Sequence, residues 1–394
     1  MPIADKMVKM VKAASMIRKM FEQGMQLKEK FGAENVFDFS LGNPDLMPPL
    51  VVKETLNDLI NNQNISHGYM PNSGFPHVRK ALSDHLKKEF DVNFTPEHIV
   101  ITCGAAGALN DVLLSLINPG EQILVPAPYF VGYNQYAFVA NAELKTAISL
   151  PDFHLDLDAI KKAINEKTRV MLINSPNNPT GAVYSKEELI GLGIILDEAS
   201  KRFGKRIYLV SDEPYRKIVY DVDVPCVLDA YPHTILLTSF SKELSLAGER
   251  IGYLAVHPDA EDASLIASAA GVSNTMLYVN APSLFQQVIG RVTGVCVDVN
   301  IYRKRRDLFC EGLLKAGYKF NIPQGAFYLF PESPIKNDIE FTKILSKYNI
   351  LVVPGTGFGA RGYFRLSYAV PEKTIINSFE GFQQARDFTL SALV

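Results

Sequence analysis

Short apolar runs alternate with helix-like segments between residues 97 and 256, and this alternation limits the possible folds more than any other feature of the chain. Each run has the length and aliphatic content of a buried strand. Most intervening segments repeat their apolar residues with helical spacing, as residues 186–203 do. Such alternation is typical of a largely parallel sheet wrapped by helices. The predicted strands are residues 99–103, 122–125, 169–173, 207–210, 234–238 and 252–256.

The two ends of the chain lack that alternation. Residues 14–31 have the amphipathic pattern of one helix, and a short extended stretch leads from it to Gly42. Toward the C-terminus, the pattern predicts a long charged helix over residues 282–315. The short apolar segments after it are interpreted as strands of a small α+β domain, and they cover residues 325–330, 350–354 and 363–367.

The composition argues against several classes of protein. Hydrophobic residues make up 47% of the chain and charged residues 21%, as in ordinary globular proteins, and 394 residues can bury a large core. The net charge of -2 does not favour nucleic acid or an anionic membrane as a partner. The basic cluster at residues 303–306 has acidic neighbours, so we interpret it as a solvated helix face.

Neither membrane targeting nor metal binding is indicated. No apolar stretch is long enough to cross a membrane, and residues 1–30 carry charges throughout, unlike a secretory signal. The four cysteines include no C-x-x-C pair, so we expect neither a disulfide framework nor a metal site. We therefore expect a cytoplasmic protein with reduced cysteines.

Lys242 lies in the segment richest in chemical groups. The predicted strand 234–238 leads into Ser239, Ser241 and Lys242, and Arg250 follows shortly after. A lysine amine can form a Schiff base with an aldehyde, while hydroxyls and a guanidinium can hold a phosphate. The segment thus suits a phosphorylated aldehyde cofactor. In isolation, it is equally compatible with a strand end followed by a solvated loop.

Polar residues also follow two other predicted strands, where open α/β sheets place their ligands. Asp212 follows the strand 207–210 and could pair with a protonated ring nitrogen, so that a cationic ring withdraws electrons from a substrate carbanion. Tyr215 lies three residues further on, and Asn178 follows the strand 169–173. Taken alone, the first segment is more often a plain turn with a capping aspartate, and the second is a rigid proline turn.

Gly104, Ala105 and Ala106 follow another predicted strand and begin a predicted helix. Small residues let backbone N–H groups approach a phosphate, and a helix N-terminus favours its negative charge. Because glycine–alanine runs before helices are common, this segment alone is a weak signal for a phosphate site.

Together these segments resemble the class I/II aminotransferases, a branch of the fold-type I pyridoxal-phosphate enzymes. In that family the lysine segment reads roughly S-x-S-K-x-x-x-x-x-G-x-R-x-G, and residues 239–252 fill every fixed position. The segments N-P-T-G, D-x-x-Y and S-x-x-K also occur here in the family's order. The resemblance covers about residues 30–385 and implies pyridoxal 5'-phosphate as the cofactor.

The resemblance also implies an architecture. It predicts an α/β fold in which a mostly parallel, seven-stranded sheet is wrapped by helices, as in pyridoxal-phosphate transferases. Residues 47–304 would form the large cofactor-binding domain, and residues 1–46 and 305–394 would form a small α+β domain from both chain ends. Tyr69 resembles the tyrosine that reaches the phosphate of the neighbouring subunit, which implies a homodimer with shared active sites.

The resemblance assigns roles to individual residues. Lys242 is expected to carry the cofactor and Asp212 to pair with its ring nitrogen, while Asn178 and Tyr215 donate hydrogen bonds to its phenolate oxygen. Phe130 is expected to stack on the ring in preference to Tyr129, although both aromatics could equally belong to the core. The expected phosphate contacts are Gly104, Ala105, Ala106, Ser239, Ser241, Arg250 and Tyr69.

On the substrate side, the resemblance implies that Arg365 binds the α-carboxylate, because a planar guanidinium suits bidentate carboxylate binding. Gly42 resembles the glycine whose backbone borders that carboxylate. One departure concerns the substrate side chain, because dicarboxylate-specific members of the family supply a second cation. Thr275 and Ala106 stand where two branches of the family place an arginine and a lysine. We therefore expect neutral amino acids to be better donors than aspartate, unless Arg18 or Lys19 supplies the cation.

The resemblance implies transamination between an L-amino acid and a 2-oxo acid, with 2-oxoglutarate or pyruvate as the acceptor. A pyridoxal-phosphate-dependent carbon–sulfur β-lyase would use the same lysine, aspartate, tyrosine and arginine, so the motifs barely distinguish the two enzymes. A cofactor-binding regulator without turnover is the remote alternative. The motifs alone do not identify the amino donor.

Overall fold

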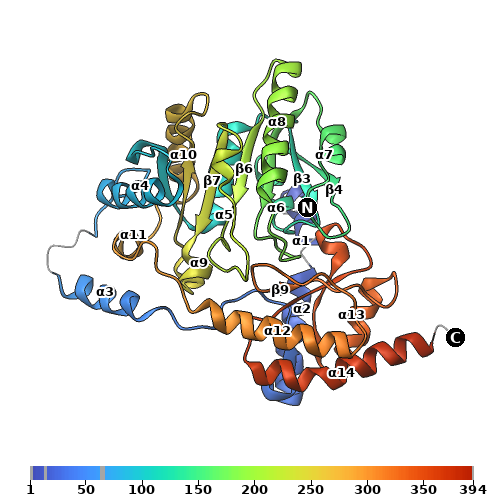
Figure 1. The fold of residues 1–394 in the computed structure, drawn as a ribbon. Helices are drawn as coiled ribbons and strands as arrows, with labels where there is room; N and C mark the ends of the chain where they lie inside the picture. The colour runs from blue at the N-terminus through green and yellow to red at the C-terminus, as the bar shows by residue number, and fades with distance from the viewer. Residues whose placement is uncertain (1–2, 13–15, 63–66, 393–394) are drawn as a thin grey trace.

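The computed structural model describes residues 3–12, 16–62 and 67–392. Its main sheet consists of β2 (Ile99–Thr102), β3 (Gln122–Ala127), β4 (Glu143–Ile148), β5 (Thr168–Asn174), β6 (Tyr208–Asp212), β7 (Thr234–Ser239) and β8 (Gly252–Val256). The seven strands lie in the order β2-β8-β7-β6-β5-β3-β4 (Figure 1). β8 is antiparallel to both of its neighbours, and the other neighbouring pairs are parallel. The predicted α/β fold with a mostly parallel, seven-stranded sheet is thus confirmed.

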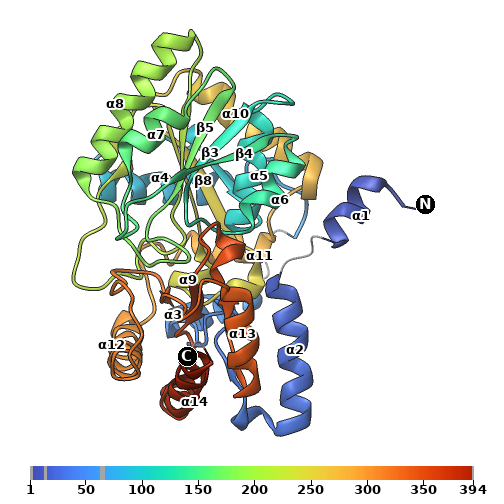
Figure 2. The ribbon, with the colours of Figure 1, turned by 90° about the vertical axis from the view of Figure 1, so that its right-hand side faces the viewer.

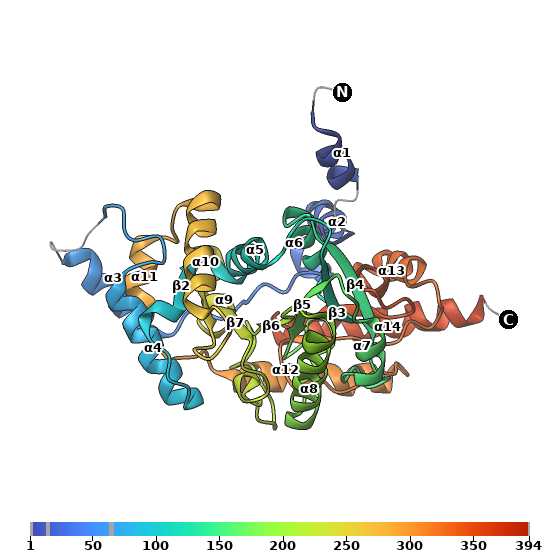
Figure 3. The same ribbon diagram turned by 90° about the horizontal axis from the view of Figure 1, so that it is seen from above.

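Helices cover both faces of this sheet, as the view from above shows (Figure 3). Successive side chains of a strand point to opposite faces, so Ile123 and Val125 belong to one hydrophobic core and Leu124 to another. The first core includes α5 (Gly104–Leu116), α6 (Tyr133–Val139) and α10 (Ala263–Tyr278). The second includes α3 (Leu50–Asn61), α4 (Pro76–Phe90), α7 (Leu157–Ala163), α8 (Lys186–Phe203) and α11 (Ser283–Ile289).

A third core lies below the sheet in Figure 1. Phe39, near the N-terminal end, packs there against Phe309 and Phe382, so both ends of the chain contribute to it. The exact domain boundaries at residues 46/47 and 304/305 stay predictions. The elements of this region are β1 (Phe37–Asp38), β9 (Tyr328–Leu329), β10 (Ile350–Leu351), β11 (Val353–Pro354), β12 (Phe364–Ser367), α12 (Val299–Lys315), α13 (Asp338–Lys347) and α14 (Glu372–Ser391).

The remaining elements are short or peripheral. α2 (Met16–Phe31) lies beside the third core, whereas α1 (Asp5–Lys12) projects away from the rest of the chain (Figure 2). The four-residue helix α9 (Phe240–Glu243) directly follows β7. Single 3₁₀ turns occupy Ala33–Asn35, Pro96–His98, Val227–Asp229, Ala247–Glu249 and Gly355–Phe358.

The structure corrects three sequence-based expectations. The helix predicted over residues 282–315 is two helices, α11 and α12, because the chain leaves α11 at Gly290 and Asp298 caps α12. The edge strand β4 was not predicted, because half of its residues are polar and most of them are exposed. The helix predicted over residues 14–31 is confirmed over Met16–Phe31, whereas residues 14–15 lie outside the described residues.

The third correction concerns the basic cluster. Arg305 and Arg306 are buried, contrary to the predicted solvated face. Arg305 forms an ion pair with Asp45 at 2.7 Å, and Arg306 pairs with Asp221 at 3.1 Å. These two cations therefore tie α12 to segments that are distant in sequence.

Candidate active site

A cavity of about 350 Å³ lies at the carboxyl ends of the central strands. Asn174, Asp212 and Ser239 are the last residues of β5, β6 and β7, and all three line it. Parallel strands present these ends at one edge of the sheet, where open α/β folds bind ligands. The other lining residues are Leu41, Gly42, Ala105, Ala106, Leu109, Phe130, Tyr136, Asn178, Pro214, Tyr215, Ser241, Lys242, Ala247, Arg250, Tyr328 and Arg365.

Lys242 brings its amine into this cavity from α9. Its Nζ donates a hydrogen bond of 2.8 Å to the backbone oxygen of Gly42. Burial, together with the charges of Arg365 and Arg250, lowers the pKa of Lys242 to about 7. A large fraction of this amine is therefore neutral near neutral pH and able to act as a nucleophile or a base.

Asp212 presents a buried carboxylate to the same cavity. Its Oδ2 accepts a hydrogen bond of 2.7 Å from the hydroxyl of Tyr133. Its Oδ1 is buried, and no donor among the described residues reaches it. Burial raises the pKa of Asp212 to about 7, although the Tyr133 bond opposes this shift. An unpartnered buried carboxylate oxygen fits a protonated ring nitrogen, which would supply both the missing hydrogen bond and a positive charge.

Asn174 holds the turns after β5 and β6 together. Its Nδ2 donates to the backbone oxygen of Asp212 at 2.7 Å, and its Oδ1 accepts from the backbone N–H of Asn178 at 2.7 Å. The Oδ1 of Asn178 in turn accepts from Arg365 at 3.1 Å. The predicted residues Asp212, Asn178 and Arg365 are thus joined through one continuous set of hydrogen bonds.

The N-terminus of α5 and the side chain of Arg250 form a basin suited to an anion. Gly104 has a φ of +71°, and a Cβ there would lie 3.0 Å from Nη2 of Arg250, so the position favours glycine. Arg250 itself has a φ of 53°, an uncommon conformation for a residue with a side chain. Ala105, Ala106, Ser239 and Ser241 line the cavity beside it. Backbone N–H groups, hydroxyls and a guanidinium together fit a phosphate.

Arg365, on β12, lies buried beside two aromatic rings. Its Cζ is 4.6 Å from the ring centre of Tyr328 and 4.9 Å from that of Phe358. Its Nη2 donates to the backbone oxygen of Ser40 at 2.6 Å, whereas its buried Nε has no partner among the described residues. No carboxylate of the described chain pairs with this guanidinium, so it is suited to bind an incoming anion.

The structure separates Tyr69 from the other predicted site residues. Tyr69 is 95% exposed and lies outside the cavity, beside Tyr278 in a shallow pocket. Phe130 lines the cavity, whereas Tyr129 does not. Gly104 begins α5 beside Arg250 without lining the cavity. The remaining predicted residues line it, including Gly42, where a Cβ would lie 1.8 Å from the hydroxyl oxygen of Tyr328.

The sequence analysis missed several residues of this site. Asn174 lies within the Asn-Pro turn that was singled out, but only the fold shows that its side chain joins two strand ends. Tyr328 lies in the predicted strand 325–330, without any sign that it lines a site. No sequence pattern marked Tyr133 or Tyr136, which come from α6.

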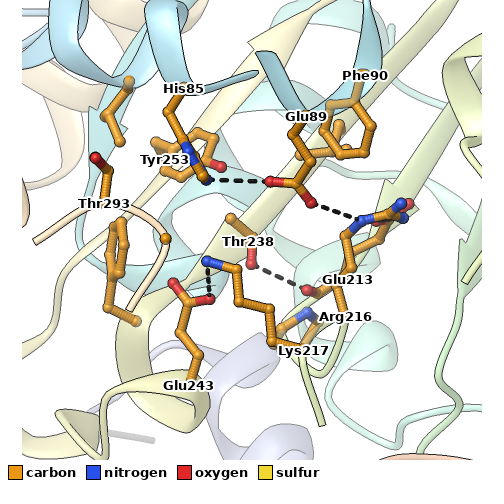
Figure 4. Close-up of a pocket in the computed structure, with 15 residues that line it drawn as sticks. His85, Glu89, Phe90, Glu213, Arg216, Lys217, Thr238, Glu243, Tyr253 and Thr293 are labelled. Carbon is orange, nitrogen blue, oxygen red and sulfur yellow. Dashed lines mark hydrogen bonds and ion pairs between the residues drawn. The ribbon is translucent and has the colours of Figure 1, made fainter. Parts of the chain in front are cut away.

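A second, much smaller cavity of about 30 Å³ contains a network of ion pairs (Figure 4). Arg216 bonds to Glu213 at 2.9 Å and to Glu89 at 3.3 Å, and Glu89 contacts His85 at 3.1 Å. Separately, Lys217 pairs with Glu243 at 2.8 Å. Glu213 directly follows Asp212 in the chain, and Glu243 follows Lys242. The network therefore anchors the two backbone turns that carry the main cavity's acid and amine.

We expect Arg216→Met to lower the free energy of unfolding by about 3–5 kcal/mol, because it leaves Glu213, which is 3% exposed, as a buried charge without its partner. Urea unfolding of the cofactor-loaded protein measures the effect. Lys80→Met is the matched control, because the Lys80–Asp84 pair on α4 is solvent-exposed and such pairs contribute little. Equal losses in the two variants would contradict the prediction.

The fold and the cavity together fit an enzyme that holds a phosphorylated aldehyde on a lysine, and comparison with known proteins identifies the family. Residues 34–380 match the family model of aminotransferase class I and II. Because the match spans most of the chain, the protein belongs to the class I and II aminotransferase family. These enzymes use pyridoxal 5'-phosphate and catalyse transamination, so the predicted class of enzyme and cofactor are confirmed.

Curated relatives and solved structures agree with this assignment. The chain is 34% identical over 353 residues to a probable aspartate aminotransferase of Methanocaldococcus jannaschii, covering 86% of this chain and 90% of the relative. It is also 34% identical to an aspartate/prephenate aminotransferase of Thermus thermophilus, covering 86% and 88% of the two chains. A crystal structure of an amino transferase from Eubacterium rectale superposes with a TM-score of 0.95 at 36% identity, covering 98% and 99%.

The Thermus thermophilus aspartate aminotransferase, solved with maleate, superposes with a TM-score of 0.85 at 28% identity over 96% of this chain and 98% of that chain. Within the part of the chain that the structure describes, no helix is long and apolar enough to cross a membrane. The same residues contain no cluster of side chains that could hold a metal ion. All four cysteines are free thiols.

Proposed function

We propose that this chain transfers the amino group of a neutral L-amino acid to a 2-oxo acid, with 2-oxoglutarate or pyruvate as the acceptor, in the cytoplasm. One observation carries the proposal: a single cavity holds the amine of Lys242, the unpartnered carboxylate of Asp212 and the buried guanidinium of Arg365. These three groups can bind the cofactor's reactive carbon, its ring nitrogen and a substrate carboxylate, respectively.

The residues that would hold the cofactor surround the cavity. When bound, pyridoxal 5'-phosphate supplies an aldehyde for covalent attachment and an electron-withdrawing ring. The phosphate contacts are Gly104, Ala105, Ala106, Ser239, Ser241 and Arg250, and the ring contacts are Phe130, Asn178, Asp212 and Tyr215.

Proton transfer falls to Lys242. Its pKa of about 7 allows the neutral amine to take a proton from the substrate Cα and the charged amine to return one. The hydrogen bond to the backbone oxygen of Gly42 orients Nζ within the cavity. Arg365 holds the substrate α-carboxylate and so places Cα relative to this amine. Ser40 and Asn178 keep the guanidinium in place through the bonds that they accept from it.

An amino-donor screen with 2-oxoglutarate tests the proposed activity. Formation of glutamate together with the donor's 2-oxo acid is the expected result. Release of ammonia and pyruvate without any added 2-oxo acid would instead identify a carbon–sulfur β-lyase. A holoenzyme that shows neither reaction would contradict an enzymatic function for the cavity.

We propose that the enzyme prefers amino acids with neutral side chains, because of the charged residues that line the cavity. Its cationic lining residues among the described side chains are Lys242, Arg250 and Arg365, and each already has a role. Thr275 does not line the cavity, and its hydroxyl donates to the backbone oxygen of Gly271. An acidic side chain buried here without a cation would lose several kcal/mol of hydration.

We expect alanine, leucine or phenylalanine to exceed aspartate in kcat/KM with a common acceptor. Aspartate is the informative competitor, because several relatives are named as aspartate aminotransferases. If aspartate is preferred by tenfold or more, about 1.4 kcal/mol, the proposed preference is wrong and another cation is present. Loss of that preference in Arg18→Ala or Lys19→Ala would then locate the cation. The side chains of these two residues lie outside the described part of the structure.

The proposed assembly is a homodimer with shared active sites. Tyr69 is 95% exposed and does not line the cavity of its own subunit, so the role that the motif implies for it would be filled in a partner's cavity. α10 also exposes a row of large apolar side chains, namely Leu265, Val272, Met276 and Leu277. A partner subunit that covers this surface would bring a second Tyr69 to the phosphate contacts. A fully active monomer in analytical sedimentation would contradict this assembly.

A further inference from the structure

We propose that Tyr328 is a positioning residue with two separable parts: its ring orients the carboxylate-binding Arg365, and its hydroxyl orients Tyr215. The inference rests on the proposed function of the cavity, and it adds a residue that the motif analysis did not mark. Tyr328 comes from β9, next to β12, which carries Arg365. Tyr215 instead follows β6 of the large sheet.

Tyr328 provides one of two aromatic rings beside Arg365. The Cζ of Arg365 lies over both rings, 4.6 Å from the ring centre of Tyr328 and 4.9 Å from that of Phe358. Because cations are attracted to aromatic faces, the two rings restrict where the guanidinium can lie. The hydrogen bonds to Ser40 and Asn178 restrict its orientation further. The ring thereby determines the direction from which Arg365 can meet a substrate carboxylate.

The hydroxyl of Tyr328 has a different partner. It lies 2.8 Å from the hydroxyl of Tyr215, and both side chains are buried. Burial raises the pKa of both phenols, so both hydroxyls stay protonated and one must donate to the other. The charged groups that act on this pair are Arg365, which lowers both pKa values, and Asp212, which raises that of Tyr215.

The same hydroxyl lies close to the backbone of Gly42. A Cβ at position 42 would lie 1.8 Å from the hydroxyl oxygen of Tyr328, so this oxygen occupies the space that the glycine leaves open. The backbone oxygen of Gly42 also accepts the bond from Lys242. When Tyr328 donates to Tyr215, the proton of Tyr215 is left free for an acceptor in the cavity. That donation also strengthens Tyr215 as a donor, because linked hydrogen bonds polarise one another.

Two single substitutions separate the two parts. Tyr328→Phe removes the hydroxyl and keeps the ring. Phe358→Leu removes the second ring beside Arg365 and keeps the hydrogen bond between the hydroxyls of Tyr215 and Tyr328. Two properties of the holoenzyme are measured. One is the dissociation constant of 4-methylpentanoate and of succinate, which are leucine and aspartate without the amino group. The other is the pH at which the absorbance of the bound cofactor changes in the absence of substrate.

For Tyr328→Phe we expect a higher absorbance pKa, because a weaker donor stabilises the deprotonated cofactor less, with carboxylate binding within about twofold of wild type. For Phe358→Leu we expect about tenfold weaker carboxylate binding and an unchanged absorbance pKa. Tyr328→Leu should show both changes. The inference is overturned if Tyr328→Phe leaves the absorbance pKa unchanged, or if both single variants alter both properties equally.

The same measurements distinguish a failure of the proposed function of the cavity from a failure of the proposed role of Tyr328. If wild-type holoenzyme binds neither carboxylate, or if Arg365→Lys leaves binding unchanged, the proposed role of the cavity is wrong whatever Tyr328 does. If wild type binds and Arg365→Lys weakens binding, only the role of Tyr328 is in question. Unfolding curves of the variants identify any change that comes from lost stability alone, and a loss of stability with both properties unchanged overturns the inference.

Discussion

The Lys242→Ala variant is expected to lose at least about 10⁴-fold in turnover while still binding pyridoxal 5'-phosphate without a covalent bond. The other cations that line the described cavity are Arg250 and Arg365, whose guanidinium groups do not deprotonate in proteins. No other amine of that lining could therefore replace Lys242 as a nucleophile or base. The proposed phosphate contacts at residues 104–106 and Arg250 do not involve Lys242, so cofactor binding should survive.

Two measurements check this expectation. Borohydride treatment of wild-type holoenzyme should attach the cofactor irreversibly to the peptide that contains Lys242, and the variant should show no such attachment. Lys201→Ala is the control, because this lysine is solvent-exposed on α8 and should change neither labelling nor turnover. Attachment to a different lysine, or turnover within tenfold of wild type, would refute the assignment.

The sequence predicted the main sheet well because buried central strands leave a strong local signal. β5 and β7 each contain a continuous apolar run, Val170–Ile173 and Ile235–Leu237, since helices cover both of their faces. The edge strand β4 left no such signal, because it is covered less and carries polar residues. The break between α11 and α12 was missed because the apolar residues Val292 and Val295 continue the helical spacing of Val288 across it, although Gly290 and Gly294 interrupt the helix.

The sequence predicted those site residues that have a distinctive chemical type and directly follow a predicted strand. Asp212 and Asn178 follow strands directly, so parallel pairing brings them to one edge of the sheet. Tyr133 comes from α6 and Tyr328 from β9 of the separate three-stranded sheet. Their local sequences resemble those of any core segment. Arg305 likewise became a buried ion-pair partner only because the fold brings Asp45 beside it.

Asp212→Ala is expected to slow proton transfer at the substrate Cα by more than about 10²-fold, while the cofactor stays attached to Lys242. In the described structure, the only hydrogen bond to the side-chain carboxylate comes from Tyr133, and Oδ1 has no partner. A carboxylate held there would stabilise a positive charge on the ring nitrogen. Alanine removes that charge without disturbing the amine, because no hydrogen bond joins Asp212 to Lys242 among the described residues.

Tyr133→Phe is a milder companion variant. It keeps the carboxylate of Asp212 but removes the hydrogen bond from Tyr133, which lowers the pKa of that carboxylate. Burial already raises the pKa of Asp212 to about 7, so losing the Tyr133 bond should raise it further. Since the ionised carboxylate is the active form, the acidic limb of the kcat profile should move to higher pH.

Single-turnover rates of Cα proton transfer, measured across pH with a deuterated donor, check both variants. A near-wild-type rate for Asp212→Ala would show that this aspartate serves only the turn after β6, and an unmoved acidic limb in Tyr133→Phe would separate Asp212 from the pH dependence.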